Sequence, residues 1–295
     1  MGILETPQDA MAGLLPACGA DSIQRVGQSC WRLAFSNGAI RAALAATDGD
    51  WLTLEVRPPA ASRRSSSPQS LWHYLGKNHW LPGGIKFVLR PQDRSPRIRA
   101  ELPLEAGICT AEAVCAAGQG LRAAFHYPGT AEELRPSSMA ARNDEGQTIG
   151  CDLEELCTSV GWGFARRASG HLAVRLESPG GACHAILTHH GQGVSATVCL
   201  AAGKALGAKP RHALAILLLT VAGLVRMIRP TALQEDGRTA LGYEVVMGSC
   251  PTAGQLDRVL SALSVACGLC GSREVAAMQD EYIADRYLAM RGWAS

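Results

Sequence analysis

Two cysteines spaced for redox or metal chemistry stand near the end of the sequence. Cys267 and Cys270 have the C-x-x-C spacing of a thiol–disulfide pair or of half a zinc site. The motif lies near the end of an apolar helix that is predicted to begin at Thr252, where the helix dipole opposes a thiolate. No second C-x-x-C completes a zinc site. We interpret both cysteines as structural, with metal binding and redox activity as the alternatives.

A second candidate combines Cys183-His184 with His189-His190. Successive side chains of a strand point to opposite faces, so these four residues cannot converge from one strand. They could supply two zinc ligands at most, and the sequence offers no further pair at ligand spacing. We therefore predict no metal site here.

Aromatic and imidazole groups surround a short predicted helix in the first half of the chain. Trp72, His73, His79 and Trp80 could line a pocket. They could equally cover the edge of a sheet, which is the interpretation we favour. An enzyme or a metal-binding protein with a pocket near His73, His79 and Trp80, or near Cys183 and His184, is the alternative.

The sequence lacks the common catalytic motifs. It contains no Gly-x-Ser-x-Gly and no phosphate-binding P-loop, and Gly161-Trp162-Gly163 lacks the third glycine of a dinucleotide fingerprint. The adjacent acidic pairs Glu132-Glu133 and Glu154-Glu155 would point apart on a helix rather than form an acid–base dyad. We predict no catalytic residue, no cofactor and no metal, and expect that the protein is not an enzyme.

Composition narrows the class of protein further. Of the 295 residues 47% are hydrophobic and 18% charged, with 28 Lys plus Arg against 26 Asp plus Glu. Such a chain is too apolar and too weakly charged for disorder, and it is long enough for two domains. The near-neutral charge and an aromatic content of 5% give no reason to expect nucleic acid as a partner.

Three features predict a cytoplasmic protein that is not inserted in a membrane. The first fifteen residues contain Glu5 and Asp9 and no basic residue, unlike a secretory signal. The most apolar stretch, residues 213–225, is shorter than the roughly 20 residues that span a bilayer and is interpreted as a buried core helix. The eleven cysteines are scattered and odd in number, as expected of free thiols in a reducing compartment.

Each half of the chain contains three alternating segments of strand length, separated by turn residues. Asp48-Gly49-Asp50 and Gly191-Gln192-Gly193 stand at the same place, between the second and third segments. Two consecutive hairpins predict an antiparallel meander in each half. The segments are 31–35, 40–46 and 51–56, and then 171–177, 184–189 and 194–200.

The elements after each meander are also parallel between the halves. A helix, two strands and a closing helix follow, and a helix opens each half, which gives the order α-β-β-β-α-β-β-α twice. The opening helices are predicted at 7–15, resuming near Ile23, and at 152–164 with Asp152 as N-cap. The remaining predictions are helix 71–78, strands 85–90 and 97–102 and helix 111–125, then helix 211–224, strands 225–229 and 239–247 and a helix from Thr252.

The predicted fold class is therefore α+β, with two tandem domains that have antiparallel sheets. The domains are 1–127 and 151–295, and the Pro-, Gly- and Ser-rich stretch 128–150 is a linker between them. An extra C-terminal helix is expected over 272–290, and a role in oligomer formation is one interpretation of it.

This order of elements resembles the class I type III secretion chaperones and the related YbjN-like proteins. The best local match is the stretch 71–104, a short helix, a Leu-Pro turn, a strand, a loop with Asp and a strand ending in Leu-Pro-Leu. The second half keeps the order but lacks the Leu-Pro turn and the Leu-Pro-Leu ending. The matching residues are Asn78, Leu81, Pro82, Gly84, Phe87, Asp93, Leu102, Pro103 and Leu104.

The resemblance implies a non-enzymatic protein-binding module that binds an extended segment of a partner protein. Because the family forms homodimers, two copies in one chain imply a monomer with an internal pseudo-twofold. The chain departs from the family in its double length, its net charge of +2 and its C-terminal helix. Partner contacts are predicted at Leu33 and Phe35 in the first half and at Leu172 and Val174 in the second, if these face outward.

Overall fold

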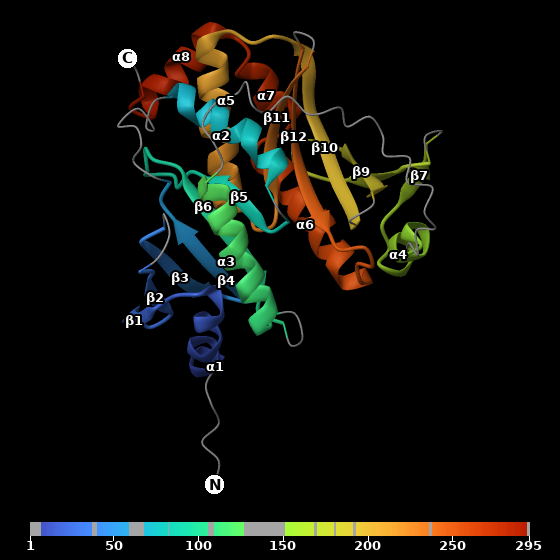
Figure 1. Ribbon diagram of the computed structural model, residues 1–295. Coiled ribbons are helices and arrows are strands. Elements are labelled where there is room, and N and C mark those ends of the chain that lie inside the picture. The colour runs from blue at the N-terminus through green and yellow to red at the C-terminus, as the bar shows by residue number, and fades with distance from the viewer. Residues whose placement is uncertain are drawn as a thin grey trace.

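The protein has an α+β fold with two six-stranded antiparallel sheets, seen in a computed structural model (Figure 1). The strands alternate with helices along the chain, and both sheets belong to one molecule with a continuous apolar core. The structure describes residues 7–36, 40–58, 68–81, 83–105, 109–126, 151–167, 170–179, 181–190, 193–235 and 238–293. The predicted linker 128–150 lies outside these residues.

Sheet 1 belongs to the first half, and its strand order is β1-β2-β3-β4-β6-β5. Its neighbours are all antiparallel, and the crossover between β4 and β5 is made by α2. The elements are α1 Pro7–Leu14, the 3-10 turn η1 Leu15–Cys18, β1 Ser22–Gly27, β2 Cys30–Ala34, β3 Ala42–Asp48, β4 Trp51–Val56, α2 Pro68–Lys77, the 3-10 turn η2 Asn78–Trp80, β5 Ile85–Val88, β6 Arg97–Pro103 and α3 Ala111–His126.

Sheet 2 belongs to the second half, and its strand order, read from the opposite end, is β7-β8-β9-β10-β12-β11. The two sheets therefore connect their strands in the same way, with α5 making the crossover that α2 makes in sheet 1. The elements are α4 Leu153–Ser159, β7 Phe164–Arg166, β8 Leu172–Leu176, β9 Cys183–His190, β10 Gly193–Lys204, α5 Ala208–Leu224, β11 Arg229–Glu235, β12 Arg238–Met247, α6 Ala253–Leu269, α7 Ser272–Ala277 and α8 Glu281–Met290.

The predicted meanders are present as β2-β3-β4 and β8-β9-β10, but each half has one strand more than predicted. The stretch after Cys18 was predicted to resume as helix and instead forms β1, which pairs with β2 across a tight turn. The helix predicted over 152–164 ends at Ser159, and Phe164 begins β7. Gly161, with a φ of 78°, allows the reversal between them. The order in each half is thus α-β-β-β-β-α-β-β-α.

Two further boundaries differ from the predictions. The C-terminal stretch forms two helices rather than one, because Asp280 interrupts it and accepts hydrogen bonds from the backbone N–H groups of Tyr282 and Ile283 as the N-cap of α8. Residues 225–228 are a loop, and β11 begins at Arg229. Met227 in that loop has a φ of 69°, which takes the chain out of the extended conformation.

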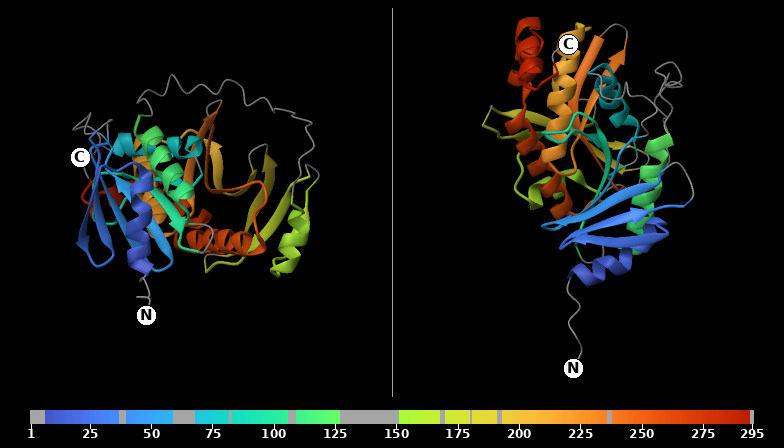
Figure 2. Two further views of the ribbon diagram at one scale, coloured as in Figure 1. Left: turned by 60° about the horizontal axis from the view of Figure 1, so that its bottom comes forward. Right: turned by 90° about the vertical axis from the view of Figure 1, so that its left-hand side faces the viewer.

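Helices cover the inner face of each sheet, and α2 and α5 pack between the halves. The first sheet is covered by α3 and the second by α6. In Figures 1 and 2 the blue strands of sheet 1 and the yellow strands of sheet 2 lie on opposite sides of the molecule. Helix α2 packs against α5 and against β11 of the other half, while α5 packs against β5. Each crossover helix therefore contacts the sheet of the opposite half.

The apolar helix predicted near residues 213–225 is the buried helix α5. Ten of its residues are buried, from Pro210 to Ala222. By length and composition alone, the stretch Ala253–Ala277 could cross a membrane. It consists of two helices, and α6 buries Leu256, Val259 and Leu263 in the core. Helices of this kind are common in protein cores, so the stretch is weak support for a membrane span.

The two crossover helices approach the opposite half through a glycine one residue before the helix end. A methyl group on Gly223 of α5 would lie 2.7 Å from the carbonyl oxygen of Leu89, which follows β5. A methyl group on Gly76 of α2 would lie 3.4 Å from the carbonyl oxygen of Ala232 in β11. The contact at Gly223 is the tighter, and the Leu89 N–H donates to the carbonyl of Leu219 in α5 at 2.9 Å. Absence of a side chain thus lets α5 dock on the first half.

We predict that Gly223→Ala destabilises the protein by about 1–3 kcal/mol, because the added methyl overlaps the Leu89 backbone. The matched control is Gly254→Ala in α6, where an added methyl meets nothing within 4 Å. The control should be neutral or stabilising by about 0.5–1 kcal/mol through helix propensity. Urea unfolding of both variants measures the difference, and equal stabilities would contradict the close docking of α5.

Candidate functional site

One register row crosses all six strands of sheet 1 on its outer face, the face that points away from α3. It joins residues that are directly paired on neighbouring strands: Gln24, Arg32, Leu44, Glu55, Arg99 and Lys86. The row is exposed at Gln24 and Arg32 and buried at Glu55, Arg99 and Lys86. One end of the row therefore faces solvent, and the other is covered by the second half.

The covered end of the row holds a buried ion pair. The Lys86 ammonium lies 2.8 Å from Oε2 of Glu101, and the two side chains are 1% and 3% exposed. Lys86 also donates to the carbonyl oxygen of Val225, at 2.8 Å. Oε2 of Glu101 accepts the backbone N–H of Met227 at 2.7 Å. Both charges of the pair are thus hydrogen-bonded to the loop that follows α5 in the other half.

Arginines extend this network along sheet 1. Arg99 binds Oε1 of Glu55 through Nε at 2.7 Å and NH2 at 2.6 Å, and its NH1 donates to the Gly223 carbonyl at 2.9 Å. Arg226 from the second half lies 3.4 Å from Oε1 of Glu101 and 2.7 Å from Asp48. Every buried charge here has a partner of opposite sign or a backbone partner, as burial requires.

The same row in sheet 2 ends in a second buried ion pair. It runs through Ala165, Ala173, Ile186, Thr197, Glu244 and Arg229. Arg229 NH2 lies 3.1 Å from Oε2 of Glu244, and its NH1 donates to the carbonyl oxygen of Leu81 in the first half. His79, also from the first half, lies 3.3 Å from the same carboxylate.

The two ion pairs are reciprocal. Lys86 and Arg229 occupy the same place in the two rows, on the last strand of each sheet. Each donates to a carbonyl that follows the crossover helix of the opposite half, Val225 after α5 and Leu81 after η2. The register differs in detail, because Glu244 is directly opposite Arg229 whereas Glu101 is diagonal to Lys86. The interface between the halves is therefore built twice from similar parts.

Burial and charge act against each other on these groups. Burial lowers the pKa of Lys86 to about 8, although the neighbouring Glu101 favours its charged form. Burial alone would raise the pKa of Glu101, but Lys86 and Arg99 hold it below its ordinary value. For Glu244, His79 and Arg229 likewise outweigh burial and lower the pKa. Both carboxylates remain ionised at neutral pH.

Sequence reasoning missed this network, although one signal for it was present. Arg97, Arg99 and Glu101 alternate in β6 and so share one face of the strand. A row of charges on a strand usually indicates a solvent-exposed face. Here all three are buried, Arg99 and Glu101 against the second half and Arg97 against Asp93 and Glu55 of its own half.

The predicted partner-contact positions lie mostly in the core. Leu33, Leu172 and Val174 are at most 4% exposed, since they point inward toward the helices. Phe35 is half-buried and packs against the core. A surface cannot be built from these four side chains in this conformation. The outward residues of the same strands are their sequence neighbours, such as Arg32 in β2 and Arg175 in β8.

The cysteines form a buried cluster rather than an exposed pair. Cys267 lies at the end of α6 as predicted, and its thiol hydrogen-bonds that of Cys183 on β9. That hydrogen bond and burial raise the pKa of Cys267, and burial raises the pKa of Cys270 to about 12. The same hydrogen bond lowers the pKa of the Cys183 thiol. The raised pKa values of Cys267 and Cys270 disfavour the thiolate that redox or metal chemistry of the C-x-x-C pair needs. Within the described ranges, no three metal-ligating side chains cluster.

The predicted histidine pockets do not assemble into one site. His79 lies at the interface with Glu244, and its ring packs edge-on against Trp80 at 5.0 Å. His73 is on α2, where Nε2 is buried without a hydrogen-bond partner among the described residues and burial lowers its pKa. His184 is exposed, whereas Cys183 is half-buried and faces Cys267. Neighbouring strand residues thus point to opposite faces, as the spacing predicted.

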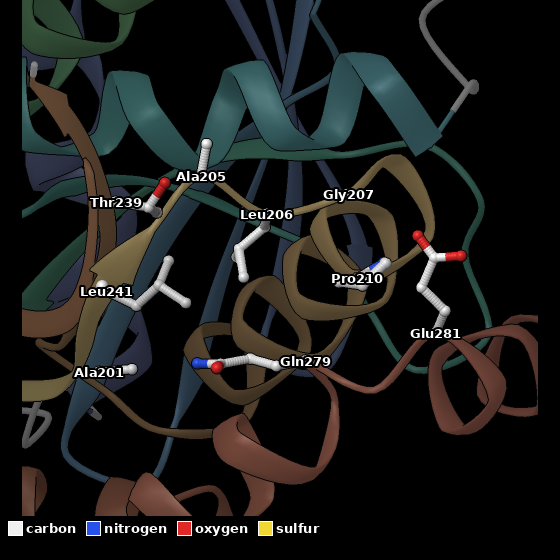
Figure 3. Close-up of a pocket in the computed structure, with 10 residues that line it drawn as sticks. Ala201, Ala205, Leu206, Gly207, Pro210, Thr239, Leu241, Gln279 and Glu281 are labelled. Carbon is white, nitrogen blue, oxygen red and sulfur yellow. The ribbon is translucent and has the colours of Figure 1, made fainter. Parts of the chain in front are cut away.

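A cavity of about 280 Å³ lies beside the start of α5 (Figure 3). Figure 3 shows Thr239 and Leu241 at one side and Glu281 at the other, with Leu206 and Gln279 between them. The Thr239 hydroxyl is buried and has no partner among the described residues. The N-terminus of α5 attracts an anion, whereas the Glu281 carboxylate repels one. The cavity therefore shows no preference for an anionic or a cationic ligand.

Comparisons with protein-family models, with curated proteins and with solved structures found no match to this chain. The geometry described above is therefore the basis for any function assigned to it.

We predict that Glu101→Gln destabilises the protein by about 3–5 kcal/mol, because it leaves the Lys86 ammonium buried without a carboxylate. The double variant Lys86→Met with Glu101→Gln should recover part of this loss. The control, Glu177→Gln, removes an exposed carboxylate 2.8 Å from Arg175 and should change stability by less than about 1 kcal/mol. Urea unfolding at neutral pH measures all three, and equal effects of the two single variants would contradict a buried ion pair.

The stability difference between wild type and Glu101→Gln should depend on pH. Because the folded-state pKa of Glu101 lies below its ordinary value of 4.5, ionised Glu101 stabilises the fold above that pH. This contribution is lost as the pH falls below 4.5 toward the folded-state pKa. The free energies of unfolding of the two proteins should therefore converge in acid, and a difference that stays constant would contradict the assignment.

Proposed function

We propose that this chain is a non-enzymatic, chaperone-like protein-binding module, built of two α+β domains that arose by tandem duplication and form a pseudo-dimer. It would bind an extended segment of a partner protein in the cytoplasm, as the resemblance to type III secretion chaperones implies. The observation that carries the proposal is the reciprocal docking of the halves, in which Lys86 and Arg229 each bind a loop of the other half.

Reciprocity is the property expected of a twofold interface. In such an interface the same patch is used by both partners, so each contact occurs twice with the roles exchanged. The common strand order of the two sheets and the crossed contacts of α2 with β11 and α5 with β5 support this reading. The opposed glycines Gly76 and Gly223 add a third pair of equivalent contacts.

The interactions of the buried carboxylates support a binding function rather than catalysis. Catalytic acids and bases are poised for proton transfer and so keep part of their hydrogen-bonding capacity for a substrate. Glu101 and Glu244 instead bind cations and backbone groups at the interface between the halves. The polar groups of this interface thus hold the molecule together.

Docking of the halves leaves part of each outer sheet face uncovered, and this is where we place the partner. In sheet 1 the uncovered part includes Arg32 and Leu44, and in sheet 2 it includes Ile186 and Thr197. These side chains are half-buried or exposed and lie on neighbouring strands. A strand face of this kind accepts an extended chain, with alternate side chains in contact.

Site-specific photo-crosslinking in the cells of origin tests the proposal. A photoreactive benzoylphenylalanine replaces Leu44 or Ile186, equivalent positions of the two rows. We expect each to form an adduct with a specific polypeptide, identified by mass spectrometry. The control position is Tyr282 on α8, which is 69% exposed and lies away from both sheets. Absence of adducts at both sheet positions, or the same adducts at Tyr282, would contradict the proposal.

Cleavage of the full chain tests the pseudo-dimer. A protease site is inserted at a position within 128–150, between the two halves, and the purified protein is then cut. We expect the two fragments to stay associated at a ratio of one to one in size-exclusion chromatography. They share a continuous apolar core, and Lys86 and Arg229 each donate a hydrogen bond to a loop of the other half. Glu101→Gln should weaken the association of the cut halves. If the cut halves without this substitution separate at micromolar concentration, the result would contradict a dimer-like interface.

A further inference from the structure

Sheet 1 has a groove lined by arginines at the end of the sheet where β2 and β4 finish and β3 and β6 begin. The groove has a volume of about 410 Å³. Its polar lining residues are Arg32, Arg41, Arg57, Arg97 and Glu55, and its apolar wall includes Leu44, Ile40 and Phe125. The volume falls within the range of ligand-binding clefts, which is about 300–1,000 Å³.

The arginines reach the groove from four places in the sheet. Arg32 is on β2, Arg41 directly precedes β3, and Arg57 directly follows β4. Val56 pairs with Ile98, so Arg57 and Arg97 meet at the same end of β4 and β6. Neighbouring strands lie about 4.8 Å apart, which brings these guanidinium groups within reach of a single ligand.

The carboxylates near the groove are already bound. Glu55 accepts hydrogen bonds from Arg99 at 2.7 Å and from Arg90 at 2.5 Å. Asp93 binds Nε of Arg97 at 2.8 Å and NH2 of the same residue at 2.7 Å. Neither carboxylate is therefore left to neutralise the arginines at the rim.

Two rim arginines are exposed and make no hydrogen bond or ion pair with the described residues, namely Arg32 and Arg57. Arg41 donates to the carbonyl oxygen of Ser36 at 2.7 Å, and among the described residues no carboxylate pairs with it. The groove thus concentrates positive charge on a chain whose net charge is only +2. An arginine cluster in a concave site is a receptor for carboxylates or phosphates, which guanidinium groups bind in bidentate fashion.

We propose that this groove binds an acidic extended segment of a partner polypeptide, with its carboxylates on Arg32, Arg41 and Arg57. The proposal rests on the protein-binding function and names the chemistry of the segment that lies on sheet 1. The groove lies between outward residues such as Arg32 and Leu44 and the end of α3 at Phe125, which suits a chain that passes over this end of the sheet. Its apolar wall at Leu44 and Phe125 receives the uncharged side chains between the acidic ones.

Nucleic acid fits this groove less well. A single strand needs a longer basic track and aromatic side chains on which successive bases stack. Phe125, from the end of α3, is the only aromatic residue of the lining, and the arginines are confined to one end of one sheet. An acidic peptide needs only the guanidinium groups and the short apolar wall.

Fluorescence anisotropy with the full-length protein tests the proposal. The probe is a fluorescein-labelled peptide with glutamate at alternate positions and valine between them, and a matched peptide carries glutamine instead. We expect the acidic peptide to bind and the glutamine peptide not to bind. Arg32→Gln with Arg57→Gln should weaken binding about tenfold, the loss expected for two partly exposed charge pairs. Both residues are exposed, so the variant should fold normally.

The matched control is Arg175→Gln, which removes an exposed arginine from the outer face of sheet 2. This variant should bind the acidic peptide as wild type does. Equal binding by wild type and the double variant, or an equal loss in the control, would overturn the proposal. So would tighter binding of citrate, pyrophosphate or a single-stranded oligonucleotide than of the peptide. The two proposals can fail separately. If Ile186 forms a partner adduct but the double variant binds the acidic peptide as wild type does, only the groove proposal is contradicted and the protein-binding function is retained.

Discussion

The burial of charged residues where the two halves dock is the constraint on which the rest of the structure depends. Lys86 and Glu101 are almost fully buried, and each bonds to the loop after α5. Removing these charges from water costs several kcal/mol, so burial by docking requires each charge to be paired and hydrogen-bonded. The position of α5, the bend at Met227 and the cover over one end of each sheet all follow from this requirement.

Much of the strand arrangement could be predicted from the sequence, and the failures have physical causes. The meanders were recognisable because their segments alternate with period two and are separated by turns such as Asp48-Gly49-Asp50. Strands β1 and β7 were missed because they are edge strands, exposed along most of their length in β1 and only three residues long in β7. Such strands depend on their neighbours more than on their own pattern.

The site was harder to predict than the fold. On β2 and β8 the alternation did carry a signal that was misread, because Arg32 and Arg175 mark the outward face and so place Leu33 and Val174 on the inward one. The charges of β6 marked one face of a strand but not what covers it, since Lys86 and Val225 meet only when the domains dock. The groove of sheet 1 depends on Arg41 and Arg57, which lie just outside the strands and have no pattern of their own.

The outer faces of the two sheets differ although the interface between the halves is reciprocal. Arg32 of sheet 1 stands where sheet 2 has Ala173, and Glu55 stands where sheet 2 has Thr197. A homodimer must present two identical faces, and so it holds two copies of a ligand or one ligand in two opposite directions. A single chain with unlike faces gives a ligand only one orientation. Under the proposed protein-binding function, complexes should form at a ratio of one to one and with a defined polarity, which a symmetric dimer cannot enforce.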